Sequence, residues 1–211
     1  MDIRSFKKLP LLGILRGIDA TAVEPLCAAI VTSGLKTIEI TMNTAEAPKL
    51  LKKMVKTAKG RLTIGAGTVL TMKDLRAAID SGATFIVLPT LVQEVVEYCV
   101  KKTIPVFPGA FTPQEIYNAW RAGATMVKVF PAKFFGPEYL REIKEPFQDI
   151  ELLACGGVTA ENLRTFFNSG ASAVAFGASV FKHEWLSGQK FALIEKSIAE
   201  FVKGYRQTSP K

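Results

Sequence analysis

Two charged residues lie inside segments that otherwise have the pattern of buried strands. Glu39 is the third residue of the segment 37–43, and Lys128 is the third residue of the segment 126–132. Apolar side chains alternate with other side chains in both segments. Because successive side chains of a strand point to opposite faces, we expect Glu39 and Lys128 to point away from the face that packs on helices.

Burial gives both groups a chemistry that they lack in water. A low-dielectric surrounding disfavours the charged ammonium, so a buried lysine is more readily the free amine that attacks a carbonyl carbon and forms a Schiff base. A buried carboxyl group beside a cation can act as a general acid and base. The alternative is that Lys128 and Glu39 pair for structure alone, since an unpaired buried charge is costly.

Two further polar residues follow predicted strands. Arg16 lies at the end of residues 11–17, and its guanidinium suits a carboxylate or a phosphate; its alternative role is to neutralise Glu39. Thr68 follows Gly65-Ala66-Gly67. These small residues would let a ligand approach the backbone, or would serve only to pack the end of the strand.

Glycine turns follow the last two predicted strands. Gly156-Gly157 ends one of them, and Gly177 with Ser179 ends the other. Many barrel enzymes bind phosphate through backbone N–H groups at these two positions, so we expect a phosphate site here. Pro89 ends the fourth predicted strand and shapes the loop after it.

Eight short segments with the pattern of buried strands recur along the chain, and each gap between them has a helical pattern. They are residues 11–17, 37–43, 62–69, 85–90, 105–111, 126–132, 151–157 and 173–179. Most of the helical patterns end in a glycine that precedes the next strand. Strands that alternate with helices predict a parallel sheet, and eight units predict an α/β fold, a closed (β/α)8 TIM barrel, as a single domain over residues 1–211. An open doubly wound sheet is the alternative. It is disfavoured because the first predicted strand is not followed by the Gly-x-Gly-x-x-Gly turn that is typical of such folds.

The composition excludes several classes of protein. The chain has 211 residues and a single histidine, His183, which nearly excludes a Ser-His-Asp triad and a zinc site built on several histidines. The 27 Lys and Arg residues and 19 Asp and Glu residues give a net charge of +8. The basic residues are scattered, so we expect no nucleic-acid binding and only a mild attraction for anionic substrates.

The sequence also bears on the location of the protein. Its three cysteines form no CxxC pair, and its start carries no apolar signal segment. No apolar run approaches the ~18 residues that a membrane helix needs. We therefore expect a cytoplasmic protein that makes no contact with a membrane.

Five strand-end segments, taken in order, resemble one enzyme family. They are Ile14-Leu15-Arg16-Gly17, Ile38-Glu39-Ile40-Thr41, Gly65-Ala66-Gly67-Thr68-Val69, Lys128-Val129-Phe130-Pro131-Ala132 and Gly156-Gly157-Val158-Thr159. They are similar to the 2-keto-3-deoxy-6-phosphogluconate (KDPG) aldolases, a family that includes the 4-hydroxy-2-oxoglutarate (KHG) and 2-keto-3-deoxy-6-phosphogalactonate (KDPGal) aldolases. The resemblance implies a homotrimeric class I aldolase on a (β/α)8 barrel, with neither metal nor cofactor. Such an enzyme splits a phosphorylated keto-deoxy sugar acid into pyruvate and glyceraldehyde 3-phosphate.

The resemblance also implies roles for individual residues. Lys128 resembles the Schiff-base lysine, and Glu39 resembles the general acid and base. Thr68 resembles the residue that holds the pyruvate carboxylate, with Arg16 nearby. The remaining positions resemble the walls of the substrate pocket and the phosphate site: Phe130 and Pro89 for the walls, and Gly156, Gly157 and Ser179 for the phosphate. Gly177 joins the substrate-binding residues through its place in the turn after the last predicted strand.

Two positions of the substrate pocket depart from the pattern of many phosphogluconate-type members. Asn43 stands where those members carry Arg, and Cys155 stands where they carry Thr, which is associated with stereochemical choice at C4. The galactonate-type members tend to have Asn at the first position and an apolar residue at the second. The resemblance favours a KDPG and KHG type of substrate, with the galactonate epimer as the alternative.

Two other functions compete with the aldolase. A barrel of the thiamine-phosphate synthase type would explain the paired glycine turns, but it needs ligands for diphosphate and magnesium and leaves Lys128 unexplained. A non-catalytic sugar-phosphate sensor would bind its ligand without an amine nucleophile, so Lys128→Arg would leave its function intact.

Overall fold

The computed structural model describes residues 1–207. The strands are β1 (Leu11–Leu15), β2 (Thr37–Thr41), β3 (Thr63–Gly67), β4 (Ile86–Val87), β5 (Val106–Phe107), β6 (Gly109–Ala110), β7 (Val127–Val129), β8 (Leu152–Cys155) and β9 (Ala171–Phe176). The helices are α1 (Ile3–Lys8), α2 (Val23–Thr32), α3 (Ala47–Ala58), α4 (Met72–Asp80), α5 (Gln93–Lys101), α6 (Pro113–Arg121), η1 (Ala132–Phe134), α7 (Gly136–Lys144), α8 (Leu163–Asn168), α9 (His183–Ser187) and α10 (Phe191–Arg206).

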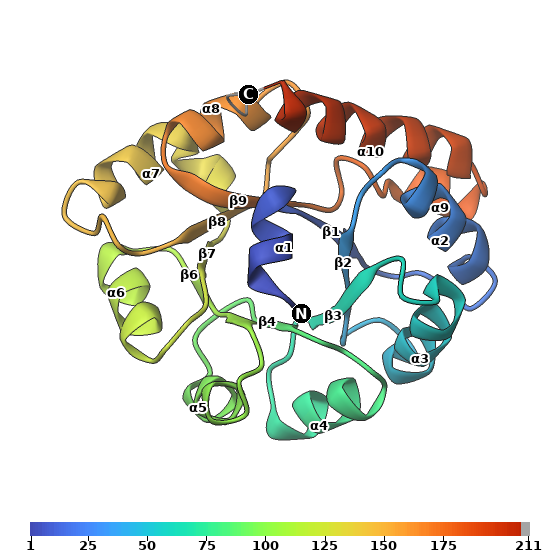
Figure 1. Cartoon of the computed structure of the whole chain (residues 1–211), viewed down its shortest axis with the longest axis horizontal. Helices are drawn as coiled ribbons and strands as arrows, with labels where there is room; N and C mark the ends of the chain where they lie inside the picture. Colours follow the sequence, from blue (N-terminus) through green and yellow to red (C-terminus); the bar gives the residue numbers. More distant parts are fainter. Residues whose placement is uncertain (208–211) are drawn as a thin grey trace.

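The strands form one parallel sheet in the order β5-β4-β3-β2-β1-β9-β8-β7-β6. Helices surround it as an outer ring (Figure 1). Each of the eight predicted segments overlaps a strand, and this confirms the predicted (β/α)8 barrel. That residues 1–211 form a single domain stays a prediction, and residues 208–211 lie outside those that the structure describes.

The fifth predicted segment contains two strands because Pro108 interrupts it. Proline has no N–H to donate to a neighbouring strand. β5 pairs with β4 on one side of this break, and β6 pairs with β7 on the other. The carbonyl of Pro108 itself accepts the backbone N–H of Lys128 at 2.8 Å. The divided strand therefore joins the two ends of the sheet and closes the barrel.

The predicted glycine stops have the backbone that they require. The glycines that directly follow the C-caps of α2, α4, α6 and α8 have φ between +86° and +96°, where side chains with a Cβ are strained; they are Gly34, Gly82, Gly123 and Gly170. Each reverses the chain from the end of a helix into the next strand.

The amino end of the barrel is closed by a helix that the sequence analysis did not predict. α1 lies across the centre of the barrel in Figure 1. Its Phe6 is buried among side chains inside the barrel, with ring centroids 6.2 Å from Phe107. Phe85 in turn meets Phe107 at 5.9 Å. These rings fill the interior at the amino end of the barrel and leave the carboxyl ends of the strands as the place for polar groups.

Candidate active site

Glu39 points into the barrel from the middle of β2. Its neighbours Ile38 and Ile40 pack in the core between sheet and helices, so the alternation predicted for this strand is confirmed. The Glu39 side chain is only 1% exposed. A Cβ at Gly67 of β3 would lie 2.2 Å from its Oε1 atom. Gly67 is therefore a glycine because the carboxyl group of Glu39 lies against its backbone.

Lys128 points into the same interior from the middle of β7. Val127 and Val129, on either side of it, pack against the outer core, as the alternation predicts. Lys128 is 6% exposed, and its Nζ lies 5.2 Å from the ring centroid of Phe130. An ammonium over an aromatic face is stabilised by the ring, so Phe130 offsets part of the cost of burying the charge.

The two groups influence each other through space. Burial raises the pKa of Glu39, while the positive charges of Lys128 and Arg16 act in the opposite direction. The Glu39 Oε2 atom is buried and has no hydrogen-bond partner in the part of the chain that the structure describes. Among the ion pairs of residues 1–207, none joins Glu39 to Lys128 or Arg16. The purely structural ion pair between Lys128 and Glu39 is therefore not formed. The raised pKa of Glu39 favours its protonated form, and the group lies where it could exchange a proton with a ligand.

Cys155, at the end of β8, belongs to the same cluster. It is buried, and burial raises the pKa of its thiol; the charge of Lys128 opposes this shift, and that of Glu39 adds to it. The thiol thus lies within the electrostatic reach of both charged groups. It is an interior side chain, and its contact with substrate stays a prediction.

Arg16 follows β1 and continues the interior side of that strand. Leu12 lies in the inner core and Ile14 packs against it, as the predicted alternation requires. Arg16 itself is exposed, because it lies beyond the last paired residue of the strand. Its charge still opposes the upward shift that burial gives to the pKa of the Glu39 carboxyl group. The guanidinium is therefore at the open end of the barrel, within reach of the buried cluster and of solvent.

The small residues before Thr68 have two different neighbours. A Cβ at Gly65 would meet the Phe85 ring at 2.5 Å, whereas one at Gly67 would meet Glu39. Gly65 thus makes room for the core and Gly67 for the carboxyl group. Thr68 has φ +54°, an uncommon conformation for a residue with a Cβ. This backbone turns the chain away at the mouth of the barrel.

The glycine turns after β8 and β9 are brought together. Gly156 and Gly157 have φ of +91° and +84°. The Ser179 hydroxyl donates a hydrogen bond to the Val158 carbonyl at 3.0 Å, which ties the second turn to the first. Gly177 lies close to Ile14 of β1, where a Cβ would come within 3.4 Å. The two turns thus form one continuous rim of the barrel mouth.

The last two predicted site residues lie around the same opening. Pro89 follows β4, and its carbonyl oxygen would lie 2.1 Å from a Cβ at Gly109, so the loop packs on the divided fifth strand. Asn43 follows β2 and is exposed. Glu39 and Lys128 lie in the middle of their strands, and the other predicted site residues lie at or just after the carboxyl end of a strand.

A pair of buried hydroxyl groups near this site was not singled out from the sequence. Thr41 and Thr44 have their Oγ1 atoms 3.0 Å apart, and the N–H of Gly17 donates to Thr44 Oγ1 at 3.1 Å. The alternation of β2 places Thr41 on the interior side, but Thr44 lies in the turn after the strand. No sequence signal marks a turn hydroxyl that reaches a neighbouring strand.

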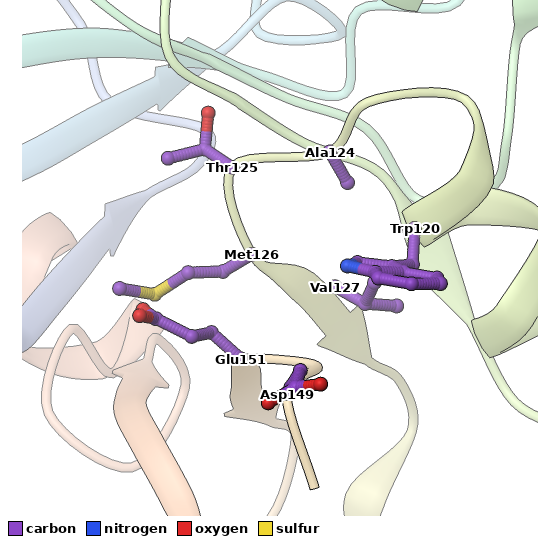
Figure 2. Close-up of a pocket in the computed structure, with 7 residues that line it drawn as sticks. All are labelled: Trp120, Ala124, Thr125, Met126, Val127, Asp149 and Glu151. Carbon is purple, nitrogen blue, oxygen red and sulfur yellow. The ribbon is translucent and has the colours of Figure 1, made fainter. Parts of the chain in front are cut away.

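A separate cavity opens at the other end of the barrel. Figure 2 shows its lining at the amino ends of β7 and β8: Trp120, Ala124, Thr125, Met126, Val127, Asp149 and Glu151. An ion pair with Lys7 of α1 engages one oxygen of Glu151. None of the predicted site residues lines this cavity, so the two ends of the barrel are chemically distinct.

Two further features concern the described part of the chain. Among residues 1–207, no three His, Cys, Asp or Glu side chains are grouped as a metal ion would require. None of the helices in that range is both long and apolar enough to cross a membrane.

Comparison with known proteins gives a consistent family. A sequence profile described as KDPG and KHG aldolase matches residues 3–197. The chain is 33% identical over 201 residues to 2-dehydro-3-deoxy-6-phosphogalactonate aldolase of Escherichia coli K12, covering 95% of this chain and 96% of that protein. It is 34% identical over 164 residues to 2-dehydro-3-deoxy-phosphogluconate aldolase of Pseudomonas aeruginosa, covering 77% of this chain and 73% of that protein.

Solved structures agree with the sequence comparisons. A native KDPGal structure superposes with a TM-score of 0.89 at 33% identity, covering 95% of this chain and 96% of that one. A cube-shaped protein cage, designed by fusing symmetric oligomeric domains, contains a chain that matches with the same TM-score of 0.89 at 33% identity; the match covers 95% of this chain and 73% of that one.

Proposed function

The chain belongs to the KDPG and KHG aldolase family, and from that premise we propose that it cleaves a 2-keto-3-deoxy-6-phospho sugar acid through a Schiff base on Lys128. One observation carries the proposal: Lys128 and Glu39 are buried in the same interior and come from different strands, and the charge of Lys128 acts on the carboxyl group. A barrel that needed only stability would fill these two positions with apolar side chains.

The reaction begins at the Lys128 amine. It attacks the C2 carbonyl carbon of the substrate, and loss of water gives a protonated imine. This cation accepts the electron pair of the C3–C4 bond, so the chemistry requires neither a metal nor a cofactor. Glu39 takes the proton of the C4 hydroxyl as the bond breaks, which releases an aldehyde and leaves an enamine on Lys128.

The same carboxyl group completes the cycle. Glu39 returns its proton to C3 of the enamine, and water then hydrolyses the imine to release pyruvate and regenerate the amine. A group that alternates between base and acid works best when its pKa is near the working pH. Burial shifts the pKa of Glu39 upward, in the direction that this double role needs.

The rim of the barrel mouth provides the binding groups. Arg16 and Thr68 hold the carboxylate of the pyruvate portion, while Phe130 and Pro89 form the walls of the pocket. The phosphate binds where backbone N–H groups and a hydroxyl converge, at Gly156, Gly157, Gly177 and Ser179. The Ser179–Val158 hydrogen bond joins the two turns and uses the single donor of that hydroxyl, so in this arrangement the backbone N–H groups supply the donors to the phosphate.

The C4 epimer is set by the residues beside the reacting bond, which we assign as Asn43 and Cys155. The first candidate substrate is KDPG, with KHG as a smaller analogue. The galactonate epimer is the second candidate, because the relative and the structure that match 95% of this chain act on it by name and because Asn43 fits that branch. Cleavage rates for the two epimers test this choice, and a large preference for the galactonate would overturn the first candidate.

We also propose that the chain forms a homotrimer in the cytoplasm. A chain of similar fold was used as a symmetric oligomeric domain in the designed cage. The cysteines Cys27, Cys99 and Cys155 are free, as is usual in a reducing compartment. Light scattering should give a mass about three times the 23.0 kDa of one chain, and a monomer or dimer would refute the trimer.

Borohydride trapping with pyruvate tests the mechanism. Reduction of the folded protein in the presence of pyruvate should fix a pyruvate adduct on Lys128, identified by peptide mass spectrometry. Lys128→Arg keeps the positive charge but cannot form the imine, so it should carry no adduct. An adduct on another lysine, or none on the folded wild type, would refute the assignment of the nucleophile and favour the phosphate-binding alternatives.

A further inference from the structure

Thr44 has no role in the proposed reaction, yet its side chain is buried between the ends of two strands. It is 5% exposed and lies three residues after the end of β2. Its backbone N–H donates to the Thr41 carbonyl at 2.9 Å, and its own carbonyl accepts the Ala47 N–H at 3.1 Å. The main chain therefore holds Thr44 in place, and its hydroxyl group is left for other partners.

The hydroxyl group of Thr44 links the two strands that carry Arg16 and Glu39. It accepts the N–H of Gly17 at 3.1 Å, and Gly17 directly follows Arg16. It also lies 3.0 Å from the hydroxyl of Thr41, which is fully buried on the same strand as Glu39. The paired residues of β1 and β2 end at Leu15 and Ile40. Thr44 thus supplies the next link across the strands, just beyond the end of the ladder.

The turn at Gly17 needs such a link. Gly17 has φ +65°, and a Cβ there would meet no atom within 4 Å, so neither steric contacts nor a side chain restrict its backbone. Among residues 1–207, no ion pair or hydrogen bond of the Arg16 side chain fixes the guanidinium either. The hydrogen bond from Gly17 to Thr44 is therefore what defines the direction in which the chain, and with it Arg16, leaves the strand.

We infer that Thr44 is a positioning residue for Arg16: its hydroxyl fixes the turn that aims the guanidinium at the carboxylate of the substrate. The inference rests on the proposed function, in which Arg16 binds that carboxylate. The carboxylate keeps its charge throughout the reaction, so Arg16 binds ground state and transition state alike. Loss of the link should therefore raise KM and leave kcat nearly unchanged.

The test compares two substitutions at Thr44. Thr44→Val keeps the branched shape and removes the hydroxyl, whereas Thr44→Ser keeps the hydroxyl. Thr44→Val should raise KM for the phosphorylated substrate, and the pyruvate concentration for half-maximal trapping, about five- to tenfold, the effect of one lost hydrogen bond. We expect kcat to stay within about twofold, and Thr44→Ser to restore KM to within about twofold of wild type.

Thr125→Val is the matched control. Thr125 Oγ1 accepts the N–H of Val106 at 3.0 Å, so this variant loses the same kind of bond. Thr125 lies at the amino end of the barrel, in the cavity of Figure 2, away from the proposed site. Because Thr44→Val also loses the hydrogen bond with the Thr41 hydroxyl, Thr125→Val should lower the melting temperature by no more than Thr44→Val does, and it should leave KM unchanged.

A double-mutant cycle shows whether Thr44 acts through Arg16. In an Arg16→Ala background, Thr44→Val should have no further effect on KM. An unchanged KM in Thr44→Val, or full additivity with Arg16→Ala, would overturn the inference while wild-type cleavage leaves the proposed function standing. A wild type that neither cleaves nor traps pyruvate would overturn both. If Thr44→Val does not fold, Thr44→Ala is expected to show the same increase in KM.

Discussion

The amino end of the barrel is filled by aromatic rings, whereas two titratable side chains are buried toward the carboxyl end, and no ion pair within residues 1–207 joins them. Phe6, Phe85 and Phe107 are buried against one another at the first end. Glu39 and Lys128 are buried at the second, where Lys128 has a hydrogen bond with the Cys155 thiol and the Oε2 atom of Glu39 has no hydrogen-bond partner among the described residues. Burying an unpaired charge lowers the free energy of unfolding, whereas burying an aromatic ring raises it. The apolar packing at the amino end therefore offsets the free energy that is lost by burying Glu39 and Lys128 toward the carboxyl end.

Lys128→Met should break the comparison most strongly, because it gives the carboxyl end the apolar character of the amino end. The variant loses the nucleophile, so we expect kcat/KM to fall on the order of 10⁴-fold or more. Replacing a desolvated cation by an apolar side chain of similar length should leave the melting temperature unchanged or raise it. Cleavage kinetics and thermal unfolding measure the two effects. A marked loss of stability would show that Lys128 has a structural role instead.

Phe6→Ala attacks the other end. Phe6 is 4% exposed and closes the barrel from below, so the variant should lose about 3 kcal/mol of the free energy of unfolding. Its kcat and KM, measured well below the unfolding transition, should match wild type. Phe134→Ala is the control: its ring is 67% exposed, and we expect a change within about 0.5 kcal/mol. A kinetic defect in Phe6→Ala would show that the two ends are coupled.

Gly65 and Gly67 of β3 face different neighbours, so replacing each of them by alanine tests a different part of the barrel. A Cβ at Gly67 would lie 2.2 Å from Glu39 Oε1, so Gly67→Ala should displace the carboxyl group and lower kcat about 10- to 100-fold. A Cβ at Gly65 would lie 2.5 Å from the Phe85 ring, so Gly65→Ala should cost about 1–3 kcal/mol of stability with kcat little changed. Equal kinetic defects in both variants would contradict the separation of site and core.

Strand alternation explains how much of this site could be predicted. It placed Glu39 and Lys128 inside the barrel because flanking residues such as Ile38 and Val129 had to meet the helices. It also placed Thr41 on the interior side. Alternation says nothing about which strands meet, so the coupling between Glu39 and Lys128 required a closed barrel, and that came from the number of strand–helix units.

Other features have signals in the sequence that are too weak to define them. The six residues of α1 are too short for a helical period, and only Phe6 is buried. Pro108 divides a strand whose two halves pair with different neighbours, and a linear sequence shows one segment there. Thr44 acts through a single hydroxyl at a turn. Each of these depends on contacts between residues that are distant along the chain.

Glu39→Gln should change stability less than Phe6→Ala does, and the sign of the change shows whether burial of the ionised carboxyl group is unfavourable or compensated. The pKa of Glu39 is raised above its ordinary value of 4.5, chiefly by burial, so the folded protein holds the proton more tightly than the unfolded chain. Stability contributed by such a group is present below pH 4.5 and is lost as the pH rises through the folded-state pKa. Glutamine remains neutral at every pH. The melting temperature of Glu39→Gln should therefore equal that of wild type at acid pH and exceed it increasingly as the pH rises, by less than Phe6→Ala lowers it. Thermal unfolding across pH measures this difference, and a variant less stable than wild type at neutral pH would show that the ionised carboxylate is held by favourable contacts instead.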